Sequence, residues 1–361
     1  MEEQLEYQHG GDIYSYDKVL DFSININPFG PSQEVQQAVH RAVSEIARYP
    51  DVHWRELLQA LSVAKRIEQR YCICGNGAAE LIFSLVQAEK PKKALLAVPS
   101  FGEYERALQS AGCTIEYVYL KREEQFDVTE EILERLDETT DILFLCSPSN
   151  PAGRLIEEGL LKQILDTCER LHIRVVFDVC FAEFSSAAGR IAEVVRKEAY
   201  RCVFWLEAFT KTYGIPGLRL GYGISRDERL LAKMRACMQP WNVSVLAQAA
   251  GVAALSAAEK KRTEQMRKYV AQERSFIEKE LKKMGIVYIP SAANYILLSS
   301  PFDLFALLKE KGILIRDCRN YVGLEQGDYR IAVKLHEENK KLIEAVSQIY
   351  RQKAKEQQKG V

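Results

Sequence analysis

The sequence predicts an α/β fold, with a mostly parallel central sheet covered by helices in a large domain and a smaller α+β domain after it. Two observations carry this prediction. From about residue 70 to residue 225, short apolar strands alternate with amphipathic helices, which is typical of a parallel sheet with both faces covered. After Pro240, two helices are followed by four short strands, a pattern typical of an α+β unit.

The expected elements follow from the periodicity of apolar residues. Strands of the large sheet are expected at residues 71–74, 94–98, 115–119, 142–146, 174–178, 202–206 and 220–224, with helical patterns between them that include 79–88, 157–171 and 191–199. Later helices are expected at 243–257 and 259–284, and later strands at 287–289, 295–298, 314–316 and 329–333. We therefore divide the chain into an N-terminal segment lying across the site (1–35), a large domain (36–255) and a small C-terminal domain (256–361).

Size, charge and cysteine content exclude several classes of protein. The 361 residues are 47% hydrophobic and 27% charged, which is enough for a large core. A formal net charge of −1 argues against a nucleic-acid or membrane partner. No segment approaches the roughly 20 apolar residues of a spanning helix, and the acidic N-terminus lacks a signal-peptide core. The nine cysteines follow no zinc or disulfide spacing, so we expect a reduced, cytoplasmic and metal-free protein.

Lys211 is the most informative residue of the chain. It lies between an apolar strand and a loop rich in glycine and proline, and Arg219 follows eight residues later. In an open α/β sheet, ligand groups follow the carboxyl ends of the strands. A lysine there, with a fixed cation nearby, suits a Schiff base to a phosphorylated carbonyl cofactor.

Further polar signatures follow other expected strands. Gly75-Asn76-Gly77 opens a helix whose free N–H groups suit a phosphate, Asn150 follows the fourth strand, and Asp178 ends the fifth. Each alone has a structural explanation, namely a tight turn, a turn initiator before proline, or a turn-capping carboxylate. Phe101 alone would be a core residue. Their occurrence together and in this order is what indicates a functional site.

Together these residue types predict a pyridoxal 5′-phosphate (PLP) site. Lys211 would supply the amine, and Asp178 a carboxylate at the pyridine nitrogen, since a protonated ring is the better electron sink. Asn150 would bond the phenolic oxygen and Phe101 would lie against the ring. The phosphate ligands are expected to be Arg219 and the amides of Gly77, Ala78 and Ala79, with the hydroxyl of Thr210.

These residues resemble the fold type I PLP-dependent enzymes of the aspartate aminotransferase-like superfamily. Further matching segments run nearly end to end: 9–11, 21–28, 48–51, 75–77, 101–104, 239–243, 293–295 and 313–318. Within the superfamily they are similar to the L-threonine-O-3-phosphate decarboxylases of cobalamin biosynthesis. The histidinol-phosphate aminotransferases are the nearest neighbouring family.

The resemblance implies roles for the substrate-binding residues. His9, Asn25 and Arg316 are expected around the substrate phosphate, while Arg330 and Asn150 would hold the α-carboxylate. Arginine suits both places because its guanidinium binds phosphate and carboxylate through two parallel hydrogen bonds. Both arginines are expected at ends of short strands. For His9, an exposed side chain without a function is the alternative.

The resemblance also implies a homodimer, because Tyr49 is expected to reach the cofactor phosphate of the other subunit. The sequence departs from the family pattern at several places, mildly at Ala152, where a threonine is usual. Ala208 stands where a serine usually bonds the cofactor phosphate, which predicts weaker PLP binding unless Thr210 compensates. Val179 and Cys180 replace a common Glu-Ala pair. Phe181 stands where aminotransferases often carry a tyrosine, and phenylalanine there suits a decarboxylase.

The activity that the resemblance implies is decarboxylation of L-threonine O-3-phosphate, or of L-serine O-phosphate, to 1-amino-2-propanol O-2-phosphate or ethanolamine phosphate for cobamide biosynthesis. The alternative is an aminotransferase of the histidinol-phosphate or aromatic amino acid type. The two differ in which bond at the α-carbon stands perpendicular to the cofactor ring. A remote alternative is a non-catalytic PLP-fold protein, against which the intact Lys211, Asp178, Asn150 and Arg219 argue.

Overall fold

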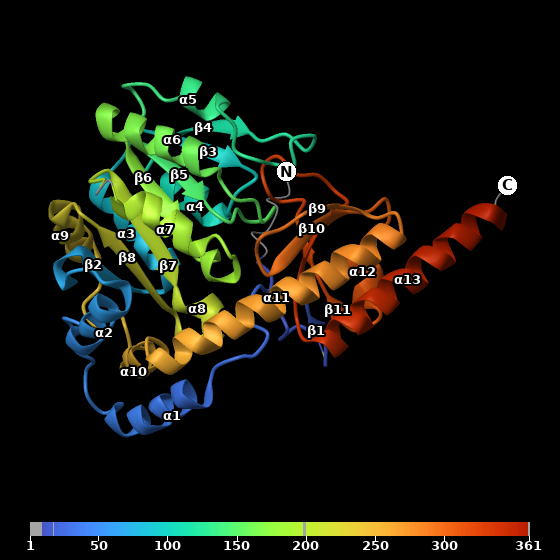
Figure 1. Cartoon of the computed structure of the whole chain (residues 1–361), viewed down its shortest axis with the longest axis horizontal. Coiled ribbons are helices and arrows are strands. Elements are labelled where there is room, and N and C mark those ends of the chain that lie inside the picture. Colours follow the sequence, from blue (N-terminus) through green and yellow to red (C-terminus); the bar gives the residue numbers. More distant parts are fainter. Residues whose placement is uncertain (1–8, 17, 198–199, 360–361) are drawn as a thin grey trace.

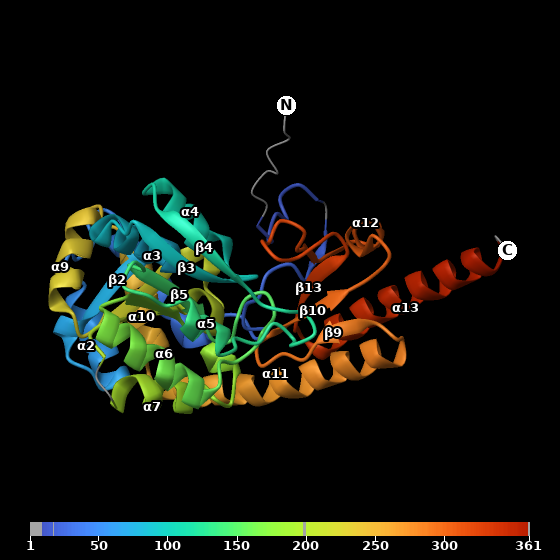
Figure 2. The same cartoon turned by 90° about the horizontal axis from the view of Figure 1, so that it is seen from above.

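The computed structural model describes residues 9–16, 18–197 and 200–359. It contains a seven-stranded sheet and a four-stranded sheet that lie side by side, with one long helix running along both (Figure 1, Figure 2). The acidic start of the expected N-terminal segment, and residues 198–199 of the expected helix 191–199, lie outside the described residues. The predicted α/β fold is confirmed.

The seven-stranded sheet has the strand order β2-β8-β7-β6-β5-β3-β4. Its strands are β2 (Cys72–Asn76), β3 (Lys93–Val98), β4 (Thr114–Tyr119), β5 (Ile142–Cys146), β6 (Arg174–Asp178), β7 (Val203–Ala208) and β8 (Leu220–Ser225). Only β8 runs against its neighbours. The carboxyl ends of β2, β5, β6 and β7 therefore share one edge, as the sequence predicts.

Helices cover both faces of this sheet, which explains why its central strands are continuously apolar. Val176 of β6 packs toward one face, and its neighbours Val175 and Phe177 pack toward the other. The first face carries α2 (Arg55–Lys65), α3 (Gly77–Glu89), α4 (Gly102–Ser110), α9 (Glu228–Cys237) and α10 (Val245–Ala254), with α1 (Gln33–Ala42) packed on α10. The second face carries α5 (Glu131–Glu134), α6 (Glu158–Leu171) and α7 (Ala188–Lys197).

The four-stranded sheet is antiparallel, with the order β12-β13-β10-β9. Its strands are β9 (Val287–Ile289), β10 (Tyr295–Ser299), β12 (Arg316–Asp317) and β13 (Asp328–Ala332). A core shared with α11 (Ala257–Lys283), α12 (Leu304–Lys309) and α13 (His336–Lys359) covers one face. Short 3₁₀ turns occur at Val43–Glu45, Gln69–Tyr71, Ala182–Phe184 and Pro216–Leu218. Among the described residues, no helix is long and apolar enough to cross a membrane.

Two expectations about the small domain are wrong. The expected strand 314–316 is two strands in different sheets, because β11 (Ile313–Leu314) pairs in parallel with β1 (Leu20–Asp21) of the N-terminal segment, whereas β12 pairs with β13. Apolar periodicity does not reveal strands of two residues. Arg330 lies in the middle of β13, and only Arg316 lies at a strand end.

Candidate active site

A cavity of about 440 Å³ lies between the carboxyl edge of the large sheet, the small sheet and the N-terminal segment. Most of the residues predicted to form the site line it: His9, Asn25, Ala78, Ala79, Phe101, Asn150, Asp178, Thr210, Lys211, Arg219, Arg316 and Arg330. Gly77 lies at the N-terminus of α3, directly before the two lining alanines. Tyr49 lies elsewhere on the surface. The fold therefore gathers residues that are up to 321 positions apart, from His9 to Arg330.

Lys211 belongs to α8 (Phe209–Thr212), a single helical turn that directly follows β7. Its side chain is partly buried and lines the cavity, and Arg330 and Arg219 are nearby cations. Burial first, and then the charge of Arg330, lower the pKa of Lys211 to about 8. The neutral amine is therefore far more populated at neutral pH than it is for an ordinary lysine, which favours a nucleophilic role.

Asp178 is the last residue of β6 and its carboxylate is held by two donors. The Tyr104 hydroxyl donates to Oδ2 across 2.6 Å, and the backbone N–H of Cys180 donates to Oδ1 across 2.9 Å. Burial raises the pKa of Asp178, and these hydrogen bonds oppose the rise. The result is a fixed carboxylate facing the cavity, suited to accept a hydrogen bond from a protonated ring nitrogen.

Arg330 is held by neutral acceptors. Its Nη1 donates to Oδ1 of Asn150 across 2.5 Å and to the Tyr321 hydroxyl across 3.3 Å, and its Nη2 donates to the Ser23 carbonyl across 3.0 Å. With its amide oxygen turned toward the guanidinium, Asn25 accepts from Nε across 3.1 Å. These contacts fix the guanidinium, and none of its hydrogen-bond partners among the described residues carries a negative charge.

Arg316 and Arg330 are direct cross-strand partners in the β12–β13 pair, so their side chains leave the same face of the sheet. They are only 7% and 6% exposed. Nη2 of Arg316 donates to Oδ1 of Asn320 across 2.7 Å. Within the described part of the chain, no carboxylate lies within ion-pair distance of either guanidinium. Facing like charges destabilise a sheet, and buried cations need counter-charges, so this arrangement suits an anionic ligand.

The N-terminus of α3 forms a cradle with Arg219. Gly77 begins the helix with a φ of +79°, and a Cβ there would lie 2.6 Å from Nη2 of Arg219. The guanidinium therefore lies against the positive end of the helix dipole, next to the first amides of the helix. Two positive groups in contact are favourable only when an anion lies between or beside them.

Glu103 and Tyr104 contribute to the site although neither was predicted to have a role there. They are adjacent residues in the first turn of α4, and both line the cavity. Oε1 of Glu103 lies 2.9 Å from Nε2 of His9. The segment 101–104 matches the family pattern, but only the orientation of α4 reveals which side chains reach the cavity. Tyr321 and Ser23 are further lining residues without a predicted role.

The whole chain can now be compared with known proteins. Residues 17–346 match the model of the family described as aminotransferase class I and II. The chain belongs to this family. It is 36% identical over 354 residues to the threonine-phosphate decarboxylase of Salmonella typhimurium, covering 94% of this chain and 96% of that protein. It is also 31% identical over 356 residues to the histidinol-phosphate aminotransferase of Bacillus subtilis subsp. natto, covering 95% and 96%.

Solved structures of the class I and II aminotransferase family have the same fold. The histidinol-phosphate aminotransferase from Clostridium acetobutylicum superposes with a TM-score of 0.85 at 28% identity, covering 92% of this chain and all of that chain. Membership makes the protein a PLP-dependent enzyme, which confirms the predicted cofactor and excludes a non-catalytic protein. The cavity fits PLP, because it offers an amine of lowered pKa, a fixed buried carboxylate and a cationic helix N-terminus.

In this member of the aminotransferase class I and II family, one of the sequence departures, Ala208, and Tyr49 have clear positions. Ala208 is the N-cap of α8 and makes no side-chain hydrogen bond, while Thr210 lines the same cavity. Weaker PLP binding therefore stays a prediction. Tyr49 is 77% exposed and stacks on Trp241 with ring centroids 4.3 Å apart. That Tyr49 reaches the cofactor phosphate of a second subunit also stays a prediction.

Proposed function

We propose that the protein is a PLP-dependent decarboxylase of L-threonine O-3-phosphate, with L-serine O-phosphate as the related substrate. One observation carries the proposal, namely the facing and nearly buried guanidinium groups of Arg316 and Arg330, whose acceptors are neutral. They suit a substrate with two anionic groups, a phosphate and an α-carboxylate. Histidinol phosphate has only one of these groups. The 36% identity to a threonine-phosphate decarboxylase supports the same reading.

The proposal assigns the cofactor to the residues that fit it. Lys211 would hold PLP through its amine, Asp178 through the ring nitrogen and Asn150 through the phenolic oxygen, with Phe101 against the ring. The cofactor phosphate would be bound by the cradle of Arg219 and the amides of residues 77–79, together with the hydroxyl of Thr210. When bound, PLP accepts the electrons of a bond broken at the substrate α-carbon.

The chain's own residues then orient the substrate and move a proton. Arg330 with Asn150 would hold the carboxylate, while Arg316, His9 and Asn25 would hold the phosphate. Binding at both ends fixes rotation at the α-carbon, so that energy from the remote phosphate is used at the reacting bond. Nζ of Lys211, with a pKa of about 8, would deliver the proton to the α-carbon after CO₂ has left.

The proposal also includes a cytoplasmic homodimer, in which Tyr49 of each subunit reaches the cofactor phosphate of the other. We also propose that the chain divides into an N-terminal segment (1–35) lying across the site, a large domain (36–255) and a small domain (256–361). The product would be 1-amino-2-propanol O-2-phosphate, or ethanolamine phosphate from L-serine O-phosphate, for cobamide biosynthesis.

The test is a product assay with PLP-loaded protein, L-threonine O-phosphate and no keto acid. We expect CO₂ and the amino alcohol phosphate in equal amounts, and no turnover by Lys211→Ala. Arg330→Met should lose most of the activity, while Arg229→Met, which changes an exposed arginine on α9, should keep it. The absence of CO₂, together with amino exchange that depends on 2-oxoglutarate, would replace the proposal by the aminotransferase alternative.

A further inference from the structure

We propose that Glu103 is a positioning residue that gives the site its selectivity for phosphorylated substrates by holding His9 at the cavity wall. The proposal rests on the proposed function, because His9 matters in this way only if that part of the cavity receives the substrate phosphate. Glu103 itself need not touch the substrate.

The contact between the two residues joins a folded helix to the N-terminal segment. Glu103 lies in the first turn of α4, is 7% exposed, and places Oε1 2.9 Å from Nε2 of His9. The His9 side chain is half exposed. His9 and Arg316 both line the main cavity and a smaller adjoining one of about 40 Å³. Glu103 therefore holds His9 on the same side of the cavity as Arg316.

The segment that carries His9 is fixed on its other side by Ser23. The N–H of Gly11 donates to the Ser23 hydroxyl across 2.7 Å. A Cβ on Gly10 would lie 2.4 Å from the Ser23 carbonyl oxygen, so the backbone passes close to this residue. Ordering a half-exposed ring only when the substrate arrives would reduce affinity, because conformational entropy would be lost at that moment. An ion-pair contact from a rigid helix orders the ring beforehand.

The contact with His9 also reduces the repulsion that the charge of Glu103 would exert on a substrate phosphate. The hydrogen bond from His9, together with the charges of His9 and Arg106, holds the pKa of Glu103 below its usual value. Nη1 of Arg106 lies 3.7 Å from Oε1. An ionised carboxylate at an anion-binding cavity repels a phosphate unless cations compensate it. Among the described residues, the charged groups near the pair include Arg106 on α4, together with Arg316 on β12 and Glu105, which line the adjoining cavity.

This arrangement gives different expectations for three single changes and one double variant. Glu103→Ala removes the 2.9 Å contact with His9 and should weaken binding of the phosphorylated substrate by about tenfold, the effect of one charge-assisted hydrogen bond. Glu103→Gln keeps an acceptor for His9 and should stay within about threefold of the wild type. His9→Ala removes the closer of the two groups that compensate the carboxylate and leaves Arg106 alone, so adding Glu103→Gln to it should restore part of the affinity.

The experiment is a titration of the absorbance of bound PLP with L-threonine O-phosphate and with L-threonine, on holoenzyme of the wild type and these variants. Glu134→Ala, an exposed carboxylate on α5, serves as the matched control. We expect Glu103→Ala to weaken binding of the phosphorylated ligand alone, with the affinity for L-threonine staying within about twofold of the wild type. Thermal melting of each variant checks that the fold is intact.

Two results would overturn the inference and separate it from the proposed function. If Glu103→Ala keeps the wild-type preference for the phosphorylated ligand, or weakens both ligands equally, Glu103 has no positioning role while the proposed function stands. If the wild type itself binds L-threonine O-phosphate no better than L-threonine, the phosphate site is wrong and the proposed function fails with it. A Glu103→Gln variant as weak as Glu103→Ala would also contradict positioning through His9.

Discussion

The Tyr104 hydroxyl donates to Oδ2 of Asp178 across 2.6 Å, and the two residues are 1% and 6% exposed. Tyr104 also stacks on Phe144, with ring centroids 4.9 Å apart, and meets Phe101 edge-on at 5.6 Å. One tyrosine therefore supports both the aromatic wall of the cavity and its buried carboxylate. Because burial raises the pKa of Asp178, each donor that opposes this rise helps to keep the carboxylate charged.

Tyr104→Phe should weaken PLP binding without disturbing the fold. The ring packing stays, but Asp178 loses a short hydrogen bond and becomes a poorer partner for a protonated ring nitrogen. We expect the dissociation constant of PLP to rise by about tenfold, as for one hydrogen bond to a charged group. Equilibrium dialysis measures this. The control is Tyr117→Phe, which removes a 2.7 Å bond to Glu105 away from Asp178. Equal PLP affinity in the wild type and Tyr104→Phe would mean that the Tyr104 hydroxyl does not support PLP binding through Asp178.

Lys211 should make the PLP-free protein less stable at neutral pH than at high pH. Its folded pKa of about 8 lies below the ordinary 10.5, so the folded state binds fewer protons than the unfolded state between these values. The free energy of unfolding therefore rises with pH in this window, and the penalty is complete below pH 8. We expect PLP-free Lys211→Met to be more stable than the wild type at pH 7, by on the order of 3 kcal/mol.

That advantage should shrink steadily as the pH approaches 10.5, because the wild-type lysine is then neutral in both states. Urea unfolding at several pH values measures the difference. Lys279→Met, which changes an exposed lysine on α11, should show a difference that does not vary with pH in this way. A constant difference for Lys211→Met would mean that burial does not lower the pKa of this amine.

More of the geometry around Lys211 than of the geometry around Arg316 can be predicted from the sequence, for physical reasons. Lys211, Asp178 and Asn150 follow apolar strands, and parallel strands bring their carboxyl ends to one edge whatever the details of packing. The pairing of Arg316 with Arg330 depends on the register of a two-residue strand, which apolar periodicity does not specify.

The same limit applies to the helix α4 and the N-terminal segment. Phe101 was predicted because an aromatic ring beside a cofactor has a recognisable role, whereas Glu103 and Tyr104 reach the cavity only because of how α4 packs on the sheet. The parallel pair of β1 and β11 joins residues almost 300 positions apart, from Leu20 to Ile313, through strands too short for a local signal.

Gly77→Ala should weaken PLP binding more than it destabilises the protein. A Cβ at this position would lie 2.6 Å from Nη2 of Arg219, and the φ of +79° disfavours any residue with a side chain. Displacing the guanidinium from the first amides of α3 removes part of the phosphate cradle. We expect at least a tenfold rise in the PLP dissociation constant and a loss of about 1–2 kcal/mol in stability.

The matched control is Gly217→Ala, in the same loop as Arg219. A Cβ there meets no atom within 4 Å, so PLP affinity should be unchanged. Fluorescence titration of both PLP-free variants with PLP gives the comparison. If Gly77→Ala and Gly217→Ala bound PLP equally well, the cradle would have no role in binding the cofactor phosphate.

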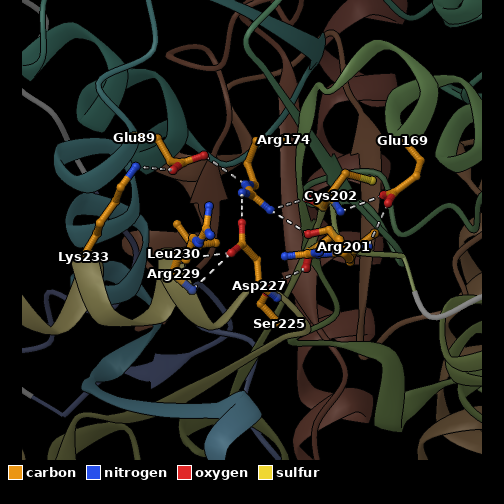
Figure 3. A network of polar contacts seen from close by, with 11 residues as sticks. Glu89, Glu169, Arg174, Arg201, Cys202, Ser225, Asp227, Arg229, Leu230 and Lys233 are labelled. Atoms are coloured by element: carbon orange, nitrogen blue, oxygen red, sulfur yellow. Dashed lines mark hydrogen bonds and ion pairs between the residues drawn. The ribbon is translucent and has the colours of Figure 1, made fainter.

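Arg174 should support stability but not catalysis, because it lies at the opposite end of β6 from Asp178. Figure 3 shows the contacts that it makes there. Its Nε lies 3.1 Å from Glu89, and its Nη2 lies 2.8 Å from Asp227. Its Nη1 donates to the backbone carbonyls of residues 201 and 202, across 2.8 and 3.1 Å. One guanidinium thus joins the start of β6 to α3, to the N-cap of α9 and to the chain entering β7.

Arg174→Met keeps the apolar stem of the side chain but leaves these partly buried acceptors without their donor. We expect a loss of about 3 kcal/mol in the free energy of unfolding, near the lower end for breaking a buried ion pair because the carboxylates keep some contact with water. Urea unfolding measures the loss, and kcat/KM of the folded holoenzyme should not change. Arg170→Met, on the exposed side of α6, should stay within about 0.5 kcal/mol of the wild type. Unaltered stability with reduced kcat/KM would instead mean that this end of β6 is coupled to the cavity through the strand that ends at Asp178.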